Sequence, residues 1–65
     1  MEKQIKKQMN KWFTPQFGNI FKITGFVYNC QNPFEKRVVV ENIKGKIFYM
    51  TQENVISLLK TSKVA

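Results

Sequence analysis

Two apolar runs joined by a turn, VVVENIKGKIFYM at residues 38–50, constrain the fold more than any other segment of the chain. Successive side chains of a strand point to opposite faces of a sheet, so these runs predict a hairpin that is apolar on both faces. A chain of 65 residues buries a smaller fraction of its surface than a longer chain does, and it has little material to cover two faces. The fold of this chain therefore depends on what covers the second face.

The turn of the hairpin is predicted at residues 42–45. Asn42 at the first position and Gly45 at the fourth fit a type I turn, with Gly45 in the left-handed conformation that often closes such hairpins. The expected cross-strand partners are Glu41 with Lys46, Val40 with Ile47, Val39 with Phe48 and Val38 with Tyr49. This register gives one continuous apolar face, made of Val38, Val40, Ile47 and Tyr49. The other face is half charged and consists of Arg37, Val39, Glu41, Lys46, Phe48 and Met50.

Helices are predicted at both ends of the chain. In residues 2–12, an apolar stripe at helical spacing runs through Ile5, Met9 and Trp12, and the segment TPQFGN at 14–19 then breaks the helix. Residues 52–62 form the second helix, with Thr51 as its N-cap and four aliphatic residues on one side.

A third strand is predicted at residues 20–28, followed by a loop at 29–36. We expect Phe21, Ile23 and Val27 on the core face of this strand. The other face carries Ile20, Lys22, Thr24, Phe26 and Tyr28. Gly25 inside the strand indicates a bulge or a sharp bend.

These elements predict a single small α+β domain over residues 1–65. An N-terminal helix, a three-stranded antiparallel sheet with a hairpin over 37–51 and a C-terminal helix packed on that sheet make up the expected fold. The bend at Gly25 leaves a small SH3-like or OB-like barrel open as the alternative.

The sequence argues against catalysis and against a bound metal. Cys30 is the one cysteine, so no internal disulfide forms, and there is no histidine. The four acidic side chains are glutamates in four different predicted elements, with no paired spacing. We therefore expect a protein that is not an enzyme, with no catalytic residue, no metal site and no cofactor.

A net charge of +7 on 65 residues suggests an acidic partner, either nucleic acid (DNA or RNA) or an acidic protein. The alternative is that the lysines serve solubility alone. Arg37 is the one arginine, and lysine suits phosphate groups better than it suits base reading. If nucleic acid is bound, we expect backbone contacts with low sequence specificity.

Cations and aromatic rings at period two along the strand at 20–28 predict a platform of the kind that binds single-stranded nucleic acid. The candidate residues are Lys22, Arg37 and Lys46 for phosphate, Phe26, Tyr28 and Phe48 for stacking, and Lys3, Lys6, Lys7 and Lys11 for additional charge. The alternative for these rings is that a strongly twisted sheet buries them all.

A second class of function uses the surplus apolar surface as a protein interface or a homodimer interface. The candidate residues are Trp12, Phe34, Val39, Phe48 and Met50. Such a protein would be a small regulator or inhibitor of the kind that phages encode, and the excess of lysine over arginine fits an AT-rich genome. No signal peptide and no apolar run of membrane-spanning length is visible, which predicts a cytoplasmic protein.

Overall fold

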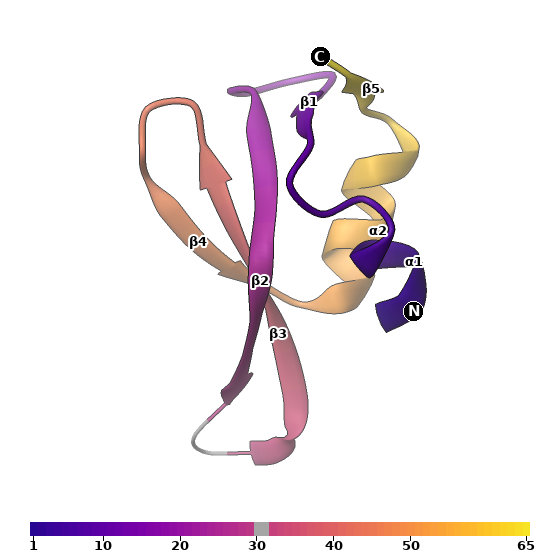
Figure 1. Cartoon of the computed structure of the whole chain (residues 1–65), viewed down its shortest axis with the longest axis vertical. Helices are drawn as coiled ribbons and strands as arrows, with labels where there is room; N and C mark the ends of the chain where they lie inside the picture. Colours follow the sequence, from indigo (N-terminus) through magenta and orange to yellow (C-terminus); the bar gives the residue numbers. More distant parts are fainter. Residues whose placement is uncertain (30–31) are drawn as a thin grey trace.

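The helices and strands follow one another in the order α1, β1, β2, β3, β4, α2, β5 (Figure 1). In the computed structural model, α1 spans Glu2–Lys6 and α2 spans Gln52–Lys60. The strands are β1 Trp12–Thr14, β2 Phe21–Asn29, β3 Asn32–Asn42, β4 Ile47–Met50 and β5 Lys63–Val64. The structure describes residues 1–29 and 32–65, and it describes side chains outside residues 29–34. Cys30 lies outside the described residues.

The strands form one antiparallel sheet in the order β4-β3-β2-β1-β5. The chain is an α+β fold with two helices and a five-stranded sheet, so the prediction of three strands was wrong. The two unpredicted strands, β1 and β5, are three and two residues long and pair with each other through Phe13 and Val64. Segments this short show no period-two pattern that the sequence alone reveals.

The alternative of a small SH3-like or OB-like barrel was also wrong. β4 and β5 stand at the two ends of the strand order and do not pair with each other in the described part of the chain, so the barrel is not closed. An open sheet keeps two edges at which backbone groups face away from any neighbouring strand.

α1 ends at Lys6, so the prediction of a helix over 2–12 was wrong in its second half. Asn10 takes a left-handed conformation at φ 63°, and its N–H donates to the carbonyl oxygen of Ile23 on β2 at 3.0 Å. A left-handed residue stops a right-handed helix. The chain then runs along the sheet from Trp12 onward, so Trp12 is a strand residue and not part of a helical stripe.

α2 agrees closely with the helix predicted at 52–62. The Oγ1 of Thr51 accepts a hydrogen bond from the N–H of Asn54 at 3.3 Å, which confirms Thr51 as the N-cap. After Lys60, the Oγ of Ser62 donates to the carbonyl oxygen of Leu58 at 2.6 Å. The chain then enters β5 directly.

β3 and β4 form the predicted hairpin in a different register. The N–H of Asn42 donates to the carbonyl oxygen of Lys46 at 2.9 Å, and Gly45 has φ 86°. The loop therefore holds three residues, 43–45, and matches a type I turn followed by a bulge at a left-handed glycine. The observed partners are Val38 with Met50, Val39 with Tyr49, Val40 with Phe48 and Glu41 with Ile47. Each residue of β4 is one position away from its predicted partner, which exchanges the two predicted faces of this strand.

A bulge in β2 decides which of its side chains share a face. Ile23 pairs with Val40 but Gly25 pairs with Val39, so Thr24 is the extra residue. A bulge shifts the alternation of all later residues. This confirms the irregularity that Gly25 indicated in the sequence.

Beyond the bulge, Phe26 lies opposite the buried Val38, and Tyr28 lies opposite Lys36. Both rings are therefore on the core side of the sheet, whereas Lys22 is on the other side. The expectation that Phe26 and Tyr28 share a face with Lys22 was wrong for this reason. Residues 32–36, predicted within a loop at 29–36, belong to β3.

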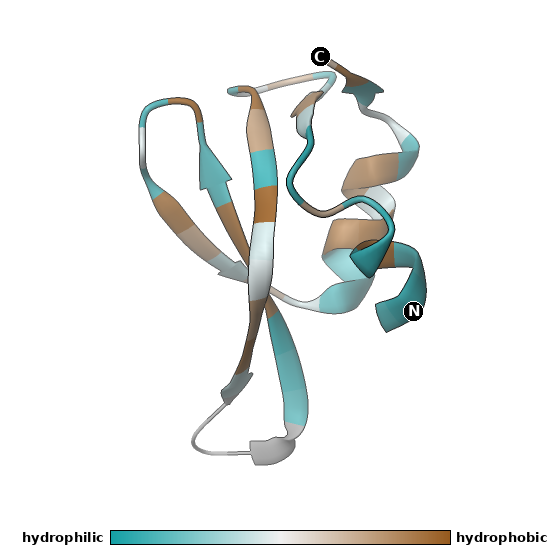
Figure 2. Ribbon diagram, in the orientation of Figure 1, coloured by the Kyte–Doolittle hydropathy of each residue, from teal (hydrophilic) through white to brown (hydrophobic). Residues whose placement is uncertain are grey.

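Both helices cover the same face of the sheet. The buried core consists of Ile5, Phe13, Phe21, Ile23, Val38, Val40 and Val55. Ile5 comes from α1 and Val55 from α2, and Figure 1 shows the two helices together on one side, with the ends of β2 and β3 extending past them. In α2, Ile56, Leu58 and Leu59 pack against this core. Figure 2 shows apolar segments along α2, while α1 is mostly hydrophilic. In the part of the chain that the structure describes, no helix lies over the second face of the sheet.

Candidate binding surface

The sheet face opposite the helices is built from three rows of cross-strand partners. The first row is Trp12, Lys22, Glu41 and Ile47, the second is Gly25, Val39 and Tyr49, and the third is Val27 and Arg37. These nine residues are called the outer face below. Each belongs to it because its strand neighbours, such as Ile23 and Val40, point into the core.

The outer face carries accessible apolar side chains beside charged ones. Tyr49 is 60% exposed, Ile47 is 50% exposed and Val27 is 39% exposed. Val39 and Trp12 are half-buried among them. A contiguous apolar patch with charged residues beside it is a common property of binding surfaces.

Trp12 and Lys22 form a cation–aromatic pair on this face. The two residues are direct partners on β1 and β2, and the Nζ of Lys22 lies 4.8 Å from the centroid of the indole ring. Such pairs are stabilised by the attraction of the ammonium group to the ring face. A cation and an aromatic ring therefore stand next to each other on a surface that no described helix covers.

Gly25 leaves a gap in the second row of the outer face. A Cβ placed on this residue meets no other atom within 4 Å, and its φ lies outside the left-handed range. Neither packing within the fold nor backbone geometry requires glycine here. Glycine inside a strand often marks a site where a ligand or another backbone approaches closely.

The residues predicted as a nucleic-acid platform are divided between the two faces of the sheet. Lys22 and Arg37 lie on the outer face. The helix side carries the other four, which are Phe26, Tyr28, Lys46 and Phe48. The bulge at Thr24 and the three-residue hairpin loop cause this division. A ligand on the outer face therefore reaches the predicted cations without the predicted rings.

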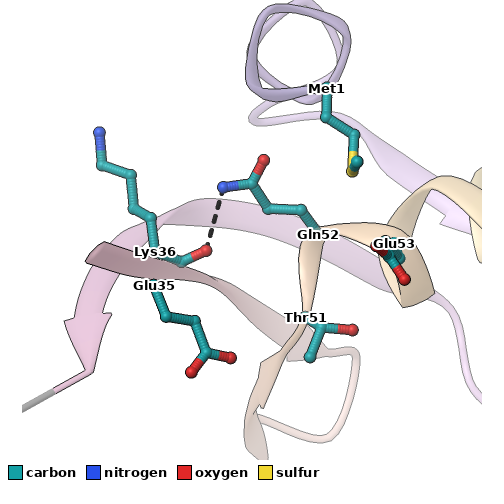
Figure 3. Close-up of a pocket in the computed structure, with 6 residues that line it drawn as sticks. All are labelled: Met1, Glu35, Lys36, Thr51, Gln52 and Glu53. Atoms are coloured by element: carbon teal, nitrogen blue, oxygen red, sulfur yellow. Dashed lines mark hydrogen bonds between the residues drawn. The ribbon is translucent and has the colours of Figure 1, made fainter. Parts of the chain in front are cut away.

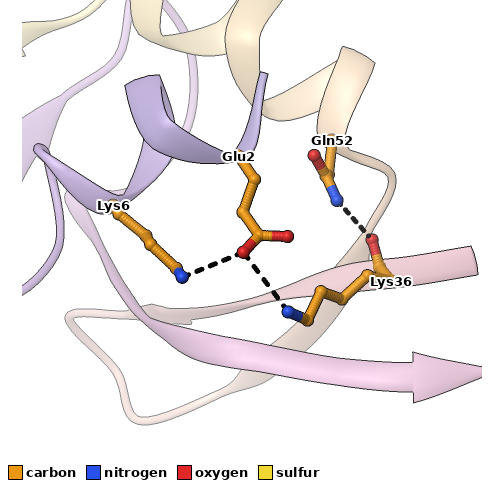
Figure 4. A network of polar contacts seen from close by, with 4 residues as sticks. All are labelled: Glu2, Lys6, Lys36 and Gln52. Atoms are coloured by element: carbon orange, nitrogen blue, oxygen red, sulfur yellow. Dashed lines mark hydrogen bonds and ion pairs between the residues drawn. The ribbon is translucent and has the colours of Figure 1, made fainter.

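On the helix side, Lys36 contacts two aromatic rings and one carboxylate. Its Nζ lies 5.3 Å from the ring centroid of Tyr28 and 5.6 Å from that of Phe26, and it donates to the Oε2 of Glu2 at 3.3 Å (Figure 4). Lys6 also pairs with the Oε2 of Glu2, at 2.9 Å. Hydrogen bonds from Lys6 and Lys36 lower the pKa of Glu2, and the hydrogen bond to Glu2 raises the pKa of Lys36.

The predicted N-terminal lysines lie on α1 and on the segment that joins it to β1. Lys3 and Lys6 belong to α1, and Lys7 follows it in the turn that leads to β1. Lys11 directly precedes Trp12, at the start of β1. All four are exposed, but α1 packs on the face opposite to the outer face.

Among the hollows on the helix side, two differ in the character of their lining. One, of about 320 Å³, is apolar and runs between the turn before β2, strand β4 and helix α2; we call it the apolar groove, lined by residues that include Pro15, Phe17, Phe48, Met50 and Leu58. The other, of about 360 Å³, lies beside Met1, Lys36 and Glu53, and most of its lining residues are polar or charged (Figure 3). There the side-chain amide of Gln52 donates to the carbonyl oxygen of Lys36 at 3.0 Å.

The residues predicted as a protein interface also fall into two groups. Trp12 and Val39 lie on the outer face, and Phe48 and Met50 line the apolar groove. The side chain of Phe34 lies outside the described residues. Sequence reasoning missed Tyr49 and Ile47 as outer-face residues. The three-residue loop closed by Gly45 places them there, and the sequence fits this loop and the predicted turn equally well.

No group of three histidine, cysteine, aspartate or glutamate side chains gathers as metal ligands within the described ranges. No described helix has both the length and the apolar character needed to cross a membrane. A scan against protein-family models, a search of curated proteins and a search of solved structures each gave no match to this chain.

Proposed function

We propose that this protein is a non-enzymatic nucleic-acid-binding protein whose contacts are mainly to the phosphate backbone and have low sequence specificity. The supporting observation is that the fold does not neutralise its own charge of +7. Ion pairs join Glu2 to Lys6 and Lys36, and Glu35 to Arg37. Within the described residues, the lysines without an ion pair are Lys3, Lys7, Lys11, Lys22, Lys44, Lys46, Lys60 and Lys63.

Of these lysines, Lys3 lies on α1, Lys22 on β2, Lys60 on α2 and Lys63 on β5. The others lie in the segments between α1 and β1 and between β3 and β4. A spread of point charges suits contact with a repeating phosphate backbone better than recognition of one small ligand. Arg37 is the side chain best suited to two-point base recognition, and it is 3.1 Å from Glu35 in an ion pair. Low sequence specificity follows from this composition. A cytoplasmic location is part of the proposal, since nucleic acid is accessible there.

Titration of labelled single- and double-stranded oligonucleotides over a range of salt concentrations tests the proposal. We expect binding that weakens steeply with salt, with a log–log slope of about 0.7 for each phosphate contact on single strands. Absence of binding to every oligonucleotide at low salt, where a charge of +7 is most favourable, contradicts the proposal.

Lysines at the N-terminus offer a matched pair of variants. Lys3→Gln combined with Lys7→Gln removes two charges at exposed positions, and Lys3→Arg combined with Lys7→Arg keeps both. We expect the glutamine variant to bind more weakly and to reduce the salt slope by about 0.7 for each phosphate that is no longer neutralised, with little change in the arginine variant. Equal affinity of both variants means that these two lysines do not contact phosphate.

A second candidate function is a protein-interaction module, such as a phage-type small regulator or inhibitor, that binds a host protein through an apolar sheet face. The observation in its favour is β4, an edge strand with Phe48 and Met50 in the apolar groove on one side and Ile47 and Tyr49 on the other. An extended segment of a partner adds to such an edge through backbone hydrogen bonds. Val39→Asp would weaken a complex on the outer face, and high salt would not.

A further inference from the structure

We propose that the preferred ligand is single-stranded nucleic acid, with its bases stacked on the outer face at Trp12 and Tyr49. This inference rests on the proposed nucleic-acid function and adds to it the form of the ligand and the surface used. It differs from the sequence-based platform, whose rings Phe26, Tyr28 and Phe48 lie on the helix side.

The two rings stand at separate points of one surface. Trp12 is on β1 in the first row, and Tyr49 is on β4 in the second row, three strands away. At about 4.8 Å between neighbouring strands, this places the two backbones about 14 Å apart across the sheet. A flexible single strand can set separate bases on both rings, whereas a duplex keeps its base faces stacked inside.

Between the two rings, the outer face has a position without a side chain. Gly25 lies in the second row beside Val39 and has no side chain, and nothing within 4 Å of it fills the gap. Val39, its cross-strand partner on β3, is half-buried. A planar base fits a shallow apolar floor of this kind between the two rings.

The outer face carries two cations and one carboxylate, so few of its groups can contact phosphate. Lys22 lies against the Trp12 ring, and Arg37 lies in the third row. Glu41, between Lys22 and Ile47 in the first row, repels phosphate from the middle of that row. Stacking, more than phosphate contact, is therefore the main attraction in the centre of this surface.

Trp12 is the one tryptophan of the chain, so its fluorescence reports on the outer face directly. The probes are a short oligothymidylate, its duplex with oligoadenylate, and an abasic oligonucleotide of the same length. We expect the single strand to quench Trp12 fluorescence and to bind most tightly. The abasic strand keeps the phosphates without the bases, and we expect it to bind at least about fivefold more weakly.

Two tyrosines provide a matched comparison. Tyr49→Ala removes a ring that is 60% exposed on the outer face, and Tyr28→Ala removes a ring that is 65% exposed on the helix side. We expect Tyr49→Ala to weaken binding of oligothymidylate by about 5- to 150-fold and Tyr28→Ala to leave it nearly unchanged. Circular dichroism of both variants verifies that they remain folded.

The outcomes separate this inference from the proposed function. If oligonucleotides bind but Trp12 fluorescence does not change, or if the abasic strand binds equally well, the inference fails and the proposed function stands. A loss of affinity in Tyr28→Ala in place of Tyr49→Ala also overturns it. If no oligonucleotide binds at low salt, the proposed function fails, and the outer face is then open to a protein partner.

Discussion

Glu2 and Lys36 are 34 residues apart in the sequence, yet the Nζ of Lys36 donates to the Oε2 of Glu2 at 3.3 Å. The contact joins α1 to β3 at the exposed end of the helix layer. Lys6 reaches the same oxygen from within α1 at 2.9 Å (Figure 4). One carboxylate therefore links the N-terminal helix to the sheet, in addition to the apolar contact of Ile5.

Acid should weaken this attachment. Hydrogen bonds from Lys6 and Lys36 lower the pKa of Glu2 below its ordinary value of 4.5. A carboxylate with a lowered pKa stabilises the fold above its unfolded pKa, and this contribution disappears as the pH falls through the folded pKa. We expect the urea midpoint of the protein to decrease below about pH 4.5, and Glu2→Gln to reduce this dependence.

Glu53→Gln is the matched control for this prediction. Glu53 occupies the first turn of α2 as Glu2 occupies that of α1, so both variants lose the same favourable interaction with a helix N-terminus. The described residues give Glu53 no ion pair to another element. An equal change in acid dependence for the two variants shows that the bond to Lys36 contributes nothing.

The side chain of Asn42 stabilises the hairpin turn. Asn42 is buried, and its Oδ1 accepts from the N–H of Lys44 at 2.9 Å and from that of Lys46 at 3.0 Å. We expect Asn42→Ala to reduce the free energy of unfolding by about 1–3 kcal/mol, because two backbone donors lose their acceptor. Urea denaturation measures this loss. Asn42→Asp keeps an oxygen at the same place, and it should be milder than the alanine variant.

This asparagine also explains why the register was not predictable. Asn42 and Gly45 fit a four-residue turn and a three-residue loop equally well, and the two alternatives differ by one position in β4. The choice depends on the hydrogen bonds of the Asn42 side chain, which no spacing rule contains. Because the period of a strand is two, this single step moved Tyr49 from the predicted core face to the outer face.

The sequence predicted correctly those elements that are formed by residues close together in the chain. Thr51 and the aliphatic residues after it predicted α2 and its cap, and Gly45 predicted the turn. Lys22, Arg37 and Val39 were expected on one face, and the pairing of β2 with β3 keeps them together. β1 and β5 depend on contacts between the two ends of the chain, such as Phe13 with Val64, which a reading of short windows does not contain.

Ile5 tests whether α1 is an integral part of the fold, which the sequence left open. The side chain is fully buried, and it is the one residue of α1 in the core. We expect Ile5→Ala to cost about 2–5 kcal/mol. For 65 residues the total stability is expected to be about 3–10 kcal/mol, so this variant approaches global unfolding. Gln4→Ala, an exposed change in the same helix, should leave the thermal midpoint nearly unchanged; a similar midpoint for both variants contradicts the docking of α1.

Two glycines should respond to alanine in opposite directions. Gly45 has φ 86° in the hairpin loop, where a side chain is strained, so Gly45→Ala should reduce the free energy of unfolding by about 1–2 kcal/mol. Gly25 lies in a strand with open space around a new Cβ, so Gly25→Ala should increase it by about 0.5–1 kcal/mol. Urea denaturation of both variants checks the pair. If Gly25→Ala stabilises the fold but weakens oligothymidylate binding, the gap at Gly25 serves the ligand; a loss of stability instead means that the bulge at Thr24 requires glycine beside it.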